Sequence, residues 1–387
     1  MNKTMKHIQA VMSGEKGGFF WPAALSFLSL LYGAGVRSRL FCFRMGLFRS
    51  KRLPCAAISV GNLTAGGAGK TPMTIFLAGL VQEMGLKPAV LSRGYRGGAE
   101  KTGGAASDGT RILMSPEDSG DEPFMMARRL SGVPVMVGRD RFDSGVRAAG
   151  EFGADAAIFD DGFQRLDLKR DLDIVLIDGR HFLGNRRMLP RGFLREPVSS
   201  LFRAHAAVFT RVENLDGPGA DPKDLWRRAG FDGPPPFPVF ACSHVPRVMG
   251  RGKGDLGFRD PGFLKGRRAL AFSGIASNSD FRDTLLGLGC EIADFRGFPD
   301  HHRYSDRELE DIRESARAAG ADYICVTEKD HARISHRISH WGPWREKLAV
   351  IGVDISFGAA EGEFRRFVQK RLAAAMKKIG RAPGKKP

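Results

Sequence analysis

The sequence predicts an α/β protein in which a parallel sheet with helices on both faces is joined to a second, smaller α/β lobe. Two observations carry this prediction. Short apolar runs alternate with segments of helical character through most of the chain, a pattern typical of a parallel sheet covered on both faces. A stretch rich in proline and glycine, residues 216–238, divides the series and predicts a linker between two lobes.

The predicted elements follow the order of the chain. In the first lobe we expect strands at residues 55–60, 87–92, 154–159, 172–177 and 206–210, and helices from residue 72, at 116–130 and at 139–152. In the second lobe we expect strands at 269–272, 323–326 and 348–353, and helices at 279–288 and 306–319.

A glycine-rich loop follows the first predicted strand and ends in Gly-Lys-Thr. It comprises Thr64, Ala65, Gly66, Gly67, Ala68, Gly69, Lys70 and Thr71. Strand, glycine loop and helix together are typical of a nucleotide phosphate cradle, in which backbone N–H groups and the helix N-terminus face the phosphates. Lys70 would reach the β- and γ-phosphates, and the Thr71 hydroxyl would ligate Mg²⁺. The usual pattern has glycine where Thr64 stands, so the loop is a variant; the alternative is a glycine-rich turn without a ligand.

The positive charge is concentrated at the two ends of the chain. The net charge is +17 over 387 residues, of which residues 1–52 carry +8 and residues 358–387 carry +7. A protein that binds nucleic acid through its folded body would carry the excess there, so we expect no nucleic-acid partner. The five cysteines are scattered and odd in number, which argues against a disulfide framework and fits a reducing compartment.

Both basic ends also contain apolar residues. Residues 19–32 are mostly apolar but shorter than the roughly 20 residues of a membrane span, and basic and aromatic residues follow them. This combination predicts a segment that lies in an anionic membrane surface; the alternative is a helix packed on the protein's own core. Near the other end, apolar residues recur at helical spacing over 364–379, which fits a second membrane contact or a capping helix equally.

These features divide the chain into four parts and refine the fold. We expect a P-loop NTPase-like parallel sheet with helices on both faces, a second, smaller α/β lobe and an N-terminal membrane-associated helix. We expect the membrane-associated segment at 1–52, the P-loop core at 53–232, the second α/β lobe at 233–357, and a basic C-terminal helix and tail at 358–387.

Acidic residues stand at two places where a nucleotide site could use them. Asp160 and Asp161 end a predicted buried strand, and a carboxylate there fits a Mg²⁺ site opposite a phosphate loop; either residue could serve, and the alternative is a simple strand-to-turn transition. Asp121 and Glu122 open a predicted helical segment. They could be a general base or metal ligand, or could only favour the helix N-terminus.

Three further clusters carry polar groups suited to a reaction. Residues 298–305 place His301 between Asp300 and a second histidine, and a neutral histidine oriented by a carboxylate can accept a hydroxyl proton; the alternative is a solvated loop. Arg93, Arg191 and Arg195 lie in two short loops. They would bind a phosphate of the substrate, or would simply face water or surface carboxylates.

Taken together, these segments resemble the tetraacyldisaccharide 4′-kinase family of Gram-negative bacteria. The segments that carry the resemblance, in the family's order, are SVGNLTAGGAGKTP at 59–72, LSRGY at 91–95, GDEP at 120–123, DDGFQ at 160–164, RDL at 170–172, LPRGFLREP at 189–197, DHH at 300–302 and TEKD at 327–330. The chain departs from the usual pattern at Arg165, Arg191, Phe193, 276–277 and His331, and none of these departures removes a residue assigned to chemistry.

The resemblance implies an ATP- and Mg²⁺-dependent kinase at the cytoplasmic face of the inner membrane. It would phosphorylate the 4′-hydroxyl of a tetraacylated disaccharide 1-phosphate, giving lipid IVA. The resemblance also implies that Asp121 and His301 form a catalytic dyad that takes the hydroxyl proton, with Lys70 on the phosphates. Glu122, with Asp160 or Asp161, would serve the metal and the nucleotide.

Two other classes of protein fit part of the sequence. One is a P-loop GTPase or ATPase switch at the membrane. A guanine-reading motif has the form Asn/Thr-Lys-x-Asp, whereas the lysine of Thr327-Glu-Lys-Asp330 stands one place late. The other is a membrane or nucleic-acid binding protein without catalysis, which only the terminal charge supports.

Overall fold

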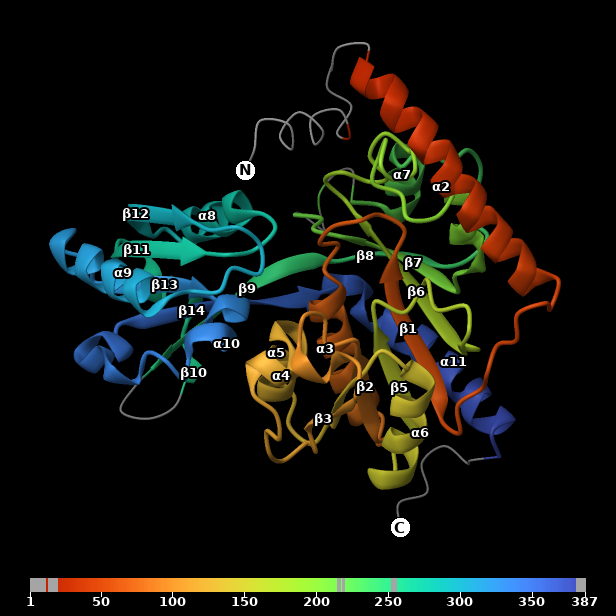
Figure 1. Ribbon diagram of the computed structural model, residues 1–387, viewed down its shortest axis with the longest axis horizontal. Helices are drawn as coiled ribbons and strands as arrows, with labels where there is room; N and C mark the ends of the chain where they lie inside the picture. The colour runs from red at the N-terminus through yellow and green to blue at the C-terminus, as the bar shows by residue number, and fades with distance from the viewer. Residues whose placement is uncertain (1–11, 13–19, 214–216, 218–219, 252–255, 381–387) are drawn as a thin grey trace. The chain divides into compact units, whose positions relative to one another are not determined.

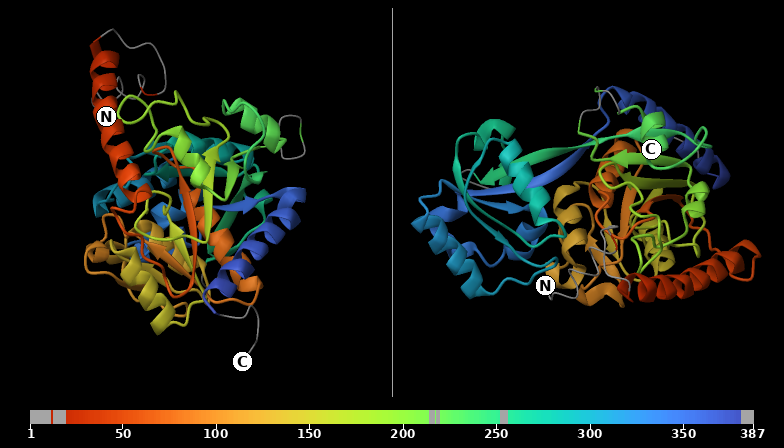
Figure 2. Two further views of the ribbon diagram at one scale, coloured as in Figure 1. Left: turned by 90° about the vertical axis from the view of Figure 1, so that its right-hand side faces the viewer. Right: turned by 90° about the horizontal axis from the view of Figure 1, so that it is seen from above.

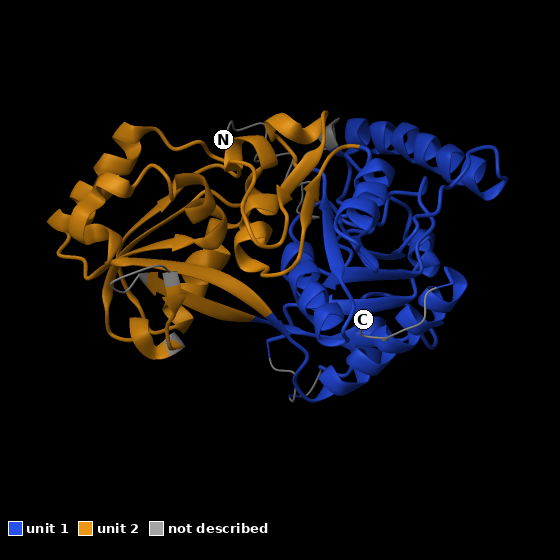
Figure 3. Ribbon diagram, turned by 90° about the horizontal axis from the view of Figure 1, so that it is seen from below, with its two compact units in different colours: residues 1–93, 140–244, 355–387 blue, residues 94–139, 245–354 orange. Residues whose placement is uncertain are grey.

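The computed structural model describes residues 12, 20–213, 217, 220–251 and 256–380. Residue contacts divide the chain into two compact units (Figure 3). Unit 1 contains residues 1–93, 140–244 and 355–387, and unit 2 contains residues 94–139 and 245–354. This division differs from the four consecutive parts expected from the sequence, because residues 94–139 join unit 2 and residues 233–244 join unit 1.

A parallel sheet forms the centre of unit 1 (Figure 1). Its strands, in spatial order, are β2 (Pro88–Ser92), β5 (Ala156–Asp160), β1 (Ala56–Asn62), β6 (Leu172–Asp178), β7 (Ala206–Thr210) and β8 (Val239–Ala241). Each adjacent pair is parallel. All residues of β1, β5 and β6 are buried, as the near-continuous apolar runs predict for a sheet covered on both faces.

Helices surround this sheet. They are α2 (Phe20–Arg44), α3 (Lys70–Glu83), α6 (Arg141–Glu151), α7 (Pro222–Arg228) and α11 (Glu361–Lys378), with 3-10 turns at η2 (Val198–Arg203) and η5 (Gly358–Ala360). Helix α3 packs on β1, β2 and β5, and α6 packs on β2 and β5. The predicted α/β fold of the P-loop type is confirmed.

Helix α2 is longer than the apolar segment at 19–32, because it continues through the basic stretch to Arg44 (Figure 2). One side is bound to unit 1: Leu25 is buried, the Ser29 hydroxyl donates to the Met188 carbonyl (2.8 Å), and the Tyr32 hydroxyl donates to the Arg195 carbonyl (3.0 Å). The other side exposes a row of apolar side chains, namely Phe27, Leu28, Leu30, Leu31 and Phe41. Among the described helices, none is both long and apolar enough to cross a membrane.

Helix α11 packs its apolar side on β1 and β6 of the sheet. Its residues Phe364, Val368, Leu372, Ala375 and Met376 are buried. Of the two alternatives for this segment, the contacts therefore support the capping helix.

Unit 2 contains a six-stranded sheet and an antiparallel pair. The sheet has the order β10 (Leu256–Phe258), β9 (Ser243–Arg251), β14 (Leu348–Ser356), β13 (Tyr323–Thr327), β11 (Arg268–Ser273) and β12 (Glu291–Gly297). Strands β14, β13, β11 and β12 are parallel, and the boundary between the units falls within β9 and β14. The antiparallel pair is β3 (Gly104–Ser107) with β4 (Val135–Val137).

The helices of unit 2 include two that replace a single expected one. They are α4 (Pro116–Ser119), α5 (Asp121–Arg129), α8 (Asn278–Gly287), α9 (Asp306–Ala318) and α10 (Glu328–Ile334), with 3-10 turns at η1 (Gly98–Glu100), η3 (Pro261–Leu264) and η4 (Ser339–Arg345). The helix predicted at 116–130 is interrupted at Gly120, which has φ 84° and ψ 158°. A side chain strongly disfavours that backbone conformation, so glycine permits the break.

Candidate active site

The glycine-rich loop connects β1 to α3 in unit 1, as the sequence predicts. Strand β1 ends at Asn62 and α3 begins at Lys70, with Gly69 in the left-handed conformation (φ 79°) as the N-cap. The loop is held from both sides. The Ala65 N–H donates to the Phe193 carbonyl (2.6 Å), and the Thr210 hydroxyl donates to the Ala68 carbonyl (3.0 Å). The unpaired N–H groups at the start of α3 favour an anion at this position.

The Lys70 ammonium group lies over the loop. It donates to the Asn62 side-chain oxygen (3.2 Å) and the Gly66 carbonyl (3.4 Å), and lies 3.7 Å from a carboxylate oxygen of Asp161. These partners hold the amine at the mouth of the phosphate cradle, where a phosphate oxygen can replace the longer contacts.

Thr71 and Asp160 meet at the start of α3. The Thr71 hydroxyl lies 3.5 Å from Oδ2 of Asp160, and Thr74 donates to its Oδ1 (3.3 Å). A hydroxyl beside a carboxylate fits Mg²⁺, which binds one or two carboxylates together with phosphate oxygens and water. Within the described part of the chain, no group of three or more His, Cys, Asp and Glu residues could hold a metal ion, so a Mg²⁺ ion here would depend on the nucleotide for further ligands.

Asp161 has a different environment from its neighbour. Its backbone is left-handed (φ 57°), which turns the side chain away from Asp160 and toward Arg195, whose guanidinium lies 2.9 Å from its Oδ2. Burial opposes ionisation of Asp161, but the charges of Lys70 and Arg195 outweigh burial and lower its pKa. The structure therefore places Asp160 beside the Thr71 hydroxyl and Asp161 among cations.

The predicted substrate arginines occupy different surroundings in unit 1. Arg195 donates to Asp161, to Gln164 (3.4 Å) and to the Asn62 side chain (3.2 Å). Arg191 is half-buried in the loop that contacts Ala65 through Phe193, and Arg93 is exposed just after β2. Arg195 is thus tied directly to the residues around Lys70.

A buried arginine that the sequence analysis did not identify lies near the same carboxylates. Arg141 begins α6 and is 5% exposed. Burial, together with repulsion from Arg165, lowers its pKa to about 10, while Asp160 and Asp161 act in the opposite direction. The sequence analysis also did not identify Asn62 as a site residue, although it lies within the segment 59–72 that carries the family resemblance.

In unit 2, the break at Gly120 starts a new helix with Asp121 and Glu122 in its first turn. Oδ2 of Asp121 lies 2.9 Å from Nδ1 of His301. The predicted pairing of Asp121 with His301 is therefore present. His301 itself has a left-handed backbone (φ 61°), a conformation that costs energy for a residue other than glycine and is often found at functional sites.

Arg333 of α10 holds the same carboxylate. Its Nε donates to Oδ2 of Asp121 (2.8 Å), and a terminal nitrogen lies 2.7 Å from the same oxygen. Burial raises the pKa of Asp121, but hydrogen bonds from His301 and Arg333 outweigh it and lower this pKa to about 2. An ionised carboxylate only accepts hydrogen bonds, so Nδ1 of His301 donates and Nε2 of the neutral ring is left to accept a proton.

A buried network fixes Arg333. Asp330, fully buried, lies 2.5 Å from the Arg333 guanidinium and accepts from the Tyr304 hydroxyl (3.0 Å), the Thr327 hydroxyl (2.6 Å) and the Gly274 N–H (3.0 Å). Asp330 is thus occupied inside unit 2. This placement argues against the switch-protein alternative, in which this aspartate would read a guanine base.

Glu122 forms an ion pair with Lys329 of α10 (3.1 Å). Lys329 Nζ also lies 3.8 Å from Asp300, whose other carboxylate oxygen lies 3.8 Å from Nε2 of His301. Glu122 belongs to unit 2, whereas Thr71 and Asp160 belong to unit 1. The sequence analysis identified neither Lys329 nor Arg333 as a site residue. Lys329 lies within the TEKD segment at 327–330, which could have indicated it.

Comparison with known proteins identifies the family. The family model for tetraacyldisaccharide-1-P 4′-kinase matches residues 21–373. The tetraacyldisaccharide 4′-kinase of Desulfatibacillum aliphaticivorans is 39% identical over 96% of this chain and 99% of its own length, and that of Syntrophus aciditrophicus is 43% identical over 80% and 84%. The crystal structure of LpxK from Aquifex aeolicus in complex with ATP has a TM-score of 0.71 and 28% identity, covering 91% of this chain and 99% of that one. The chain therefore belongs to the tetraacyldisaccharide 4′-kinase family.

Proposed function

We propose that this protein transfers the γ-phosphate of ATP to the 4′-hydroxyl of a tetraacyldisaccharide 1-phosphate, forming lipid IVA. The observation that carries the proposal is the pairing of His301 with an ionised Asp121 in a chain that also has a Gly-Lys-Thr phosphate loop. Phosphoryl transfer needs a phosphate cradle, a metal and a positioned base, because positioning and charge stabilisation supply most of the catalysis.

The nucleotide half of the reaction is assigned to unit 1. The N–H groups of the loop and Lys70 would hold the β- and γ-phosphates, and Thr71 with Asp160 would hold the metal. When bound, Mg²⁺ would neutralise charge on the phosphate oxygens. Asp161 keeps Arg195 and Lys70 together, so two positive groups would face the transferred phosphate.

The acceptor half is assigned to unit 2. The 4′-oxygen would attack the γ-phosphorus, the bond from that phosphorus to the bridging oxygen would break, and ADP would leave with that electron pair. The hydroxyl proton would pass to Nε2 of His301. Asp121 would orient the ring through Nδ1 and stabilise the imidazolium that forms, and Arg333 would keep Asp121 ionised.

We further propose that α2 rests on the anionic cytoplasmic face of the inner membrane. Its exposed side presents Phe27 and Leu30, which are 62% and 69% exposed, and Arg37 and Arg44 lie farther along the helix. Exposed apolar residues followed by arginines suit an interfacial helix. The docked side explains how such a helix stays attached to unit 1.

The proposed activity is tested by incubating the full chain with labelled ATP and Mg²⁺, with and without the tetraacyldisaccharide 1-phosphate. We expect label transfer that depends on the lipid, and a product whose mass has increased by one phosphate and whose fragments place it at the 4′ position. ATP hydrolysis that is unchanged by the lipid, with no phosphorylated product, would refute the proposal.

A further inference from the structure

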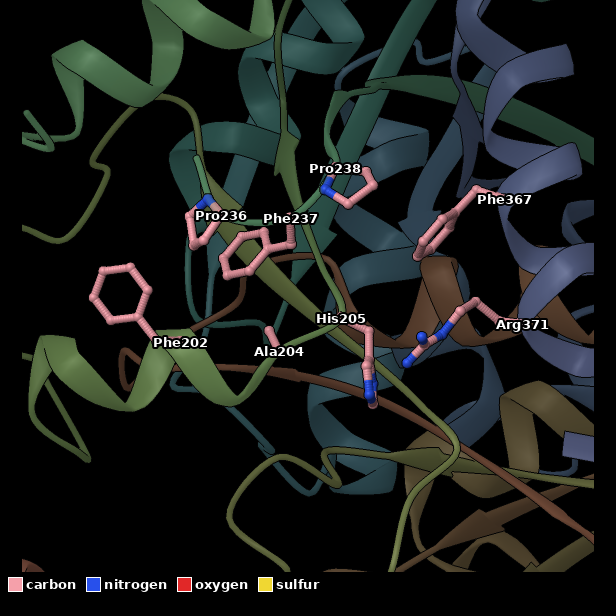
Figure 4. A pocket seen from close by; sticks show the side chains of 8 residues that line it. All are labelled: Phe202, Ala204, His205, Pro236, Phe237, Pro238, Phe367 and Arg371. Atoms are coloured by element: carbon pink, nitrogen blue, oxygen red, sulfur yellow. The ribbon is translucent and has the colours of Figure 1, made fainter. Parts of the chain in front are cut away.

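Unit 1 has two adjoining hollows beside η2 and α11. The larger, about 390 Å³, is lined by Phe202, Ala204, His205, Pro236, Phe237, Pro238, Phe367 and Arg371 (Figure 4). The smaller, about 110 Å³, shares His205 and Arg371 and adds Arg52, Arg170, Asp171, Ala374, Ala375 and Lys378. The larger volume is within the range of small-molecule sites.

The hollows lie near the amino-terminal ends of the strands, whereas the phosphate loop lies at the carboxyl-terminal ends. Asp171 and His205 immediately precede β6 and β7, whereas the phosphate loop follows the last residue of β1, which is parallel to β6. At 3.3 Å per residue, the seven residues of β1 separate the two ends of the strands by roughly 20 Å. A ligand in the hollows would therefore occupy a site separate from the nucleotide.

The charged groups of the hollows leave an excess of positive charge. Asp171 accepts from Arg52 (3.0 Å), and Arg170 donates to the buried Asp173 (2.7 Å). Those two carboxylates are thus already paired. Within the residues that the structure describes, Arg371 and Lys378 form no ion pair.

Arg371 and His205 line both hollows, and Figure 4 shows their side chains in the wall of the larger one. Nε of Arg371 is buried and has no hydrogen-bond partner, and one terminal nitrogen makes only a 3.4 Å contact to the Asp171 carbonyl. Nδ1 of His205 accepts from the Asp173 N–H (2.9 Å), so the neutral ring carries its proton on Nε2. Burial, and then the charges of Arg371 and Arg170, lower the pKa of His205 to about 4, which keeps the ring neutral near pH 7.

The rest of the larger hollow is apolar. Phe202, Phe237 and Phe367 come from three separate segments, and Pro236 and Pro238 complete the wall. The terminal N–H groups of Arg371 make one long hydrogen bond among the described residues, so they remain able to donate to an anion in the hollow. An apolar substituent on that anion would cover the aromatic wall.

We propose that these hollows bind a phosphate monoester that carries a small apolar or aromatic group, at a site independent of the phosphate loop. The phosphate would accept from Arg371 and from Nε2 of His205, with Lys378 and Arg170 nearby, and the substituent would lie against Phe202, Phe237 and Phe367. A soluble phosphate ester and the headgroup of a phosphatidic acid both present this chemistry.

The proposal is tested by calorimetric titration of the full chain with phenyl phosphate and with inorganic phosphate. We expect phenyl phosphate to bind more tightly, and Lys70→Ala to leave this binding in place. Arg371→Gln should weaken it roughly tenfold or more, since it removes a charged hydrogen-bond donor. Arg366→Gln is the matched control, because Arg366 is exposed on the same helix and lines neither hollow.

A second variant guards against misfolding of Arg371→Gln. Ala374→Glu places a carboxylate in the smaller hollow from an exposed helix position, and Ala373→Glu makes the same change one residue away, outside it. Ala374→Glu should abolish phenyl phosphate binding, and Ala373→Glu should not. Vesicles with and without phosphatidic acid distinguish the source: a loss of phosphatidic-acid-dependent binding in Arg371→Gln assigns a lipid headgroup, and unchanged vesicle binding assigns a soluble ester. Phenyl phosphate binding that survives both variants, or disappears in Lys70→Ala, would overturn the proposal.

Discussion

His301 Nδ1 lies 2.9 Å from Oδ2 of Asp121, the same oxygen to which Arg333 donates. One carboxylate oxygen therefore orients the imidazole and neutralises a buried guanidinium. Because this pairing favours the ionised form of Asp121, the mechanism proposed above assigns proton acceptance to Nε2 of His301 rather than to the carboxylate.

The dyad should behave as one unit in kinetics. We expect Asp121→Ala and His301→Ala each to lower kcat by about 10²-fold or more while changing the KM for ATP little, because a proton-accepting pair acts mainly in the transition state. The double variant should be hardly slower than the slower single variant. Steady-state kinetics of the three proteins test this, and losses that multiply would show that the residues act independently.

Arg333 should matter for turnover through Asp121. Arg333→Gln removes both donors to Oδ2 and should lower kcat roughly tenfold or more, with the KM for ATP unchanged. Arg333→Lys should recover part of the lost kcat, since lysine keeps the positive charge but cannot donate two hydrogen bonds from one planar group. A Gln variant that folds normally and keeps wild-type kcat would contradict this role.

Asp121 should also make stability depend on pH. Its folded-state pKa, about 2, lies below the ordinary 3.8, so its ionisation stabilises the fold above about pH 4, and this contribution is lost as the pH falls toward 2. The linkage is worth up to about 2 kcal/mol. Denaturant titrations should show the gap between wild type and Asp121→Asn narrowing from pH 5 to pH 2. Asp311→Asn, at an exposed position of α9, should show no such narrowing.

The phosphate loop should be needed for transfer but not for folding. Lys70→Ala and Thr71→Ala should each lower turnover by about 10²-fold or more, because they remove contacts to the γ-phosphate and the metal. Circular dichroism and thermal unfolding should stay near wild type for Lys70→Ala, because the Asn62 side chain keeps its hydrogen bond from Arg195. Near-normal turnover at saturating ATP and Mg²⁺ would show that the cradle is misassigned.

Helix α2 should bind anionic vesicles through its exposed side. Replacing Phe27, Leu30 and Leu31 together by Asn should strongly reduce sedimentation with vesicles and activity on the lipid acceptor, while ATP binding is kept. Leu286→Asn, at an exposed apolar position of α8, is the control. High salt should weaken binding without abolishing it, since the apolar part is not screened. A protein that starts at Leu53 and still sediments fully would refute the contact.

The strongest local signals in the sequence predicted the structure well. The loop from Thr64 to Thr71 lies between a strand and a helix because glycines, an apolar run and Gly-Lys-Thr all specify the same turn. The pairing of Asp121 with His301 joins residues 180 positions apart, and only the family resemblance indicated it. Nothing in the local pattern of either segment determines that contact.

Other features depend on tertiary contacts that the sequence pattern does not reveal. Arg333 is one arginine among many on an ordinary short helix, and its partner Asp121 is 212 residues away. Gly120 stands within the predicted helix at 116–130, but a glycine within a helix costs only about 1 kcal/mol. The sequence therefore did not predict that the helix breaks there. Strand β12 was missed because charged residues interrupt its short apolar run and none of its residues is fully buried.

The left-handed turn at Asp161 has a consequence for how this segment can change in evolution. Asp160 faces Thr71, and Asp161 faces Arg195, because one residue at the end of β5 reverses the direction of the side chain. A deletion or insertion of one residue there would exchange the two environments or misplace both carboxylates. The segment should therefore tolerate changes of residue type better than changes of length, and a library of single-residue insertions across 158–164 should yield no active kinase.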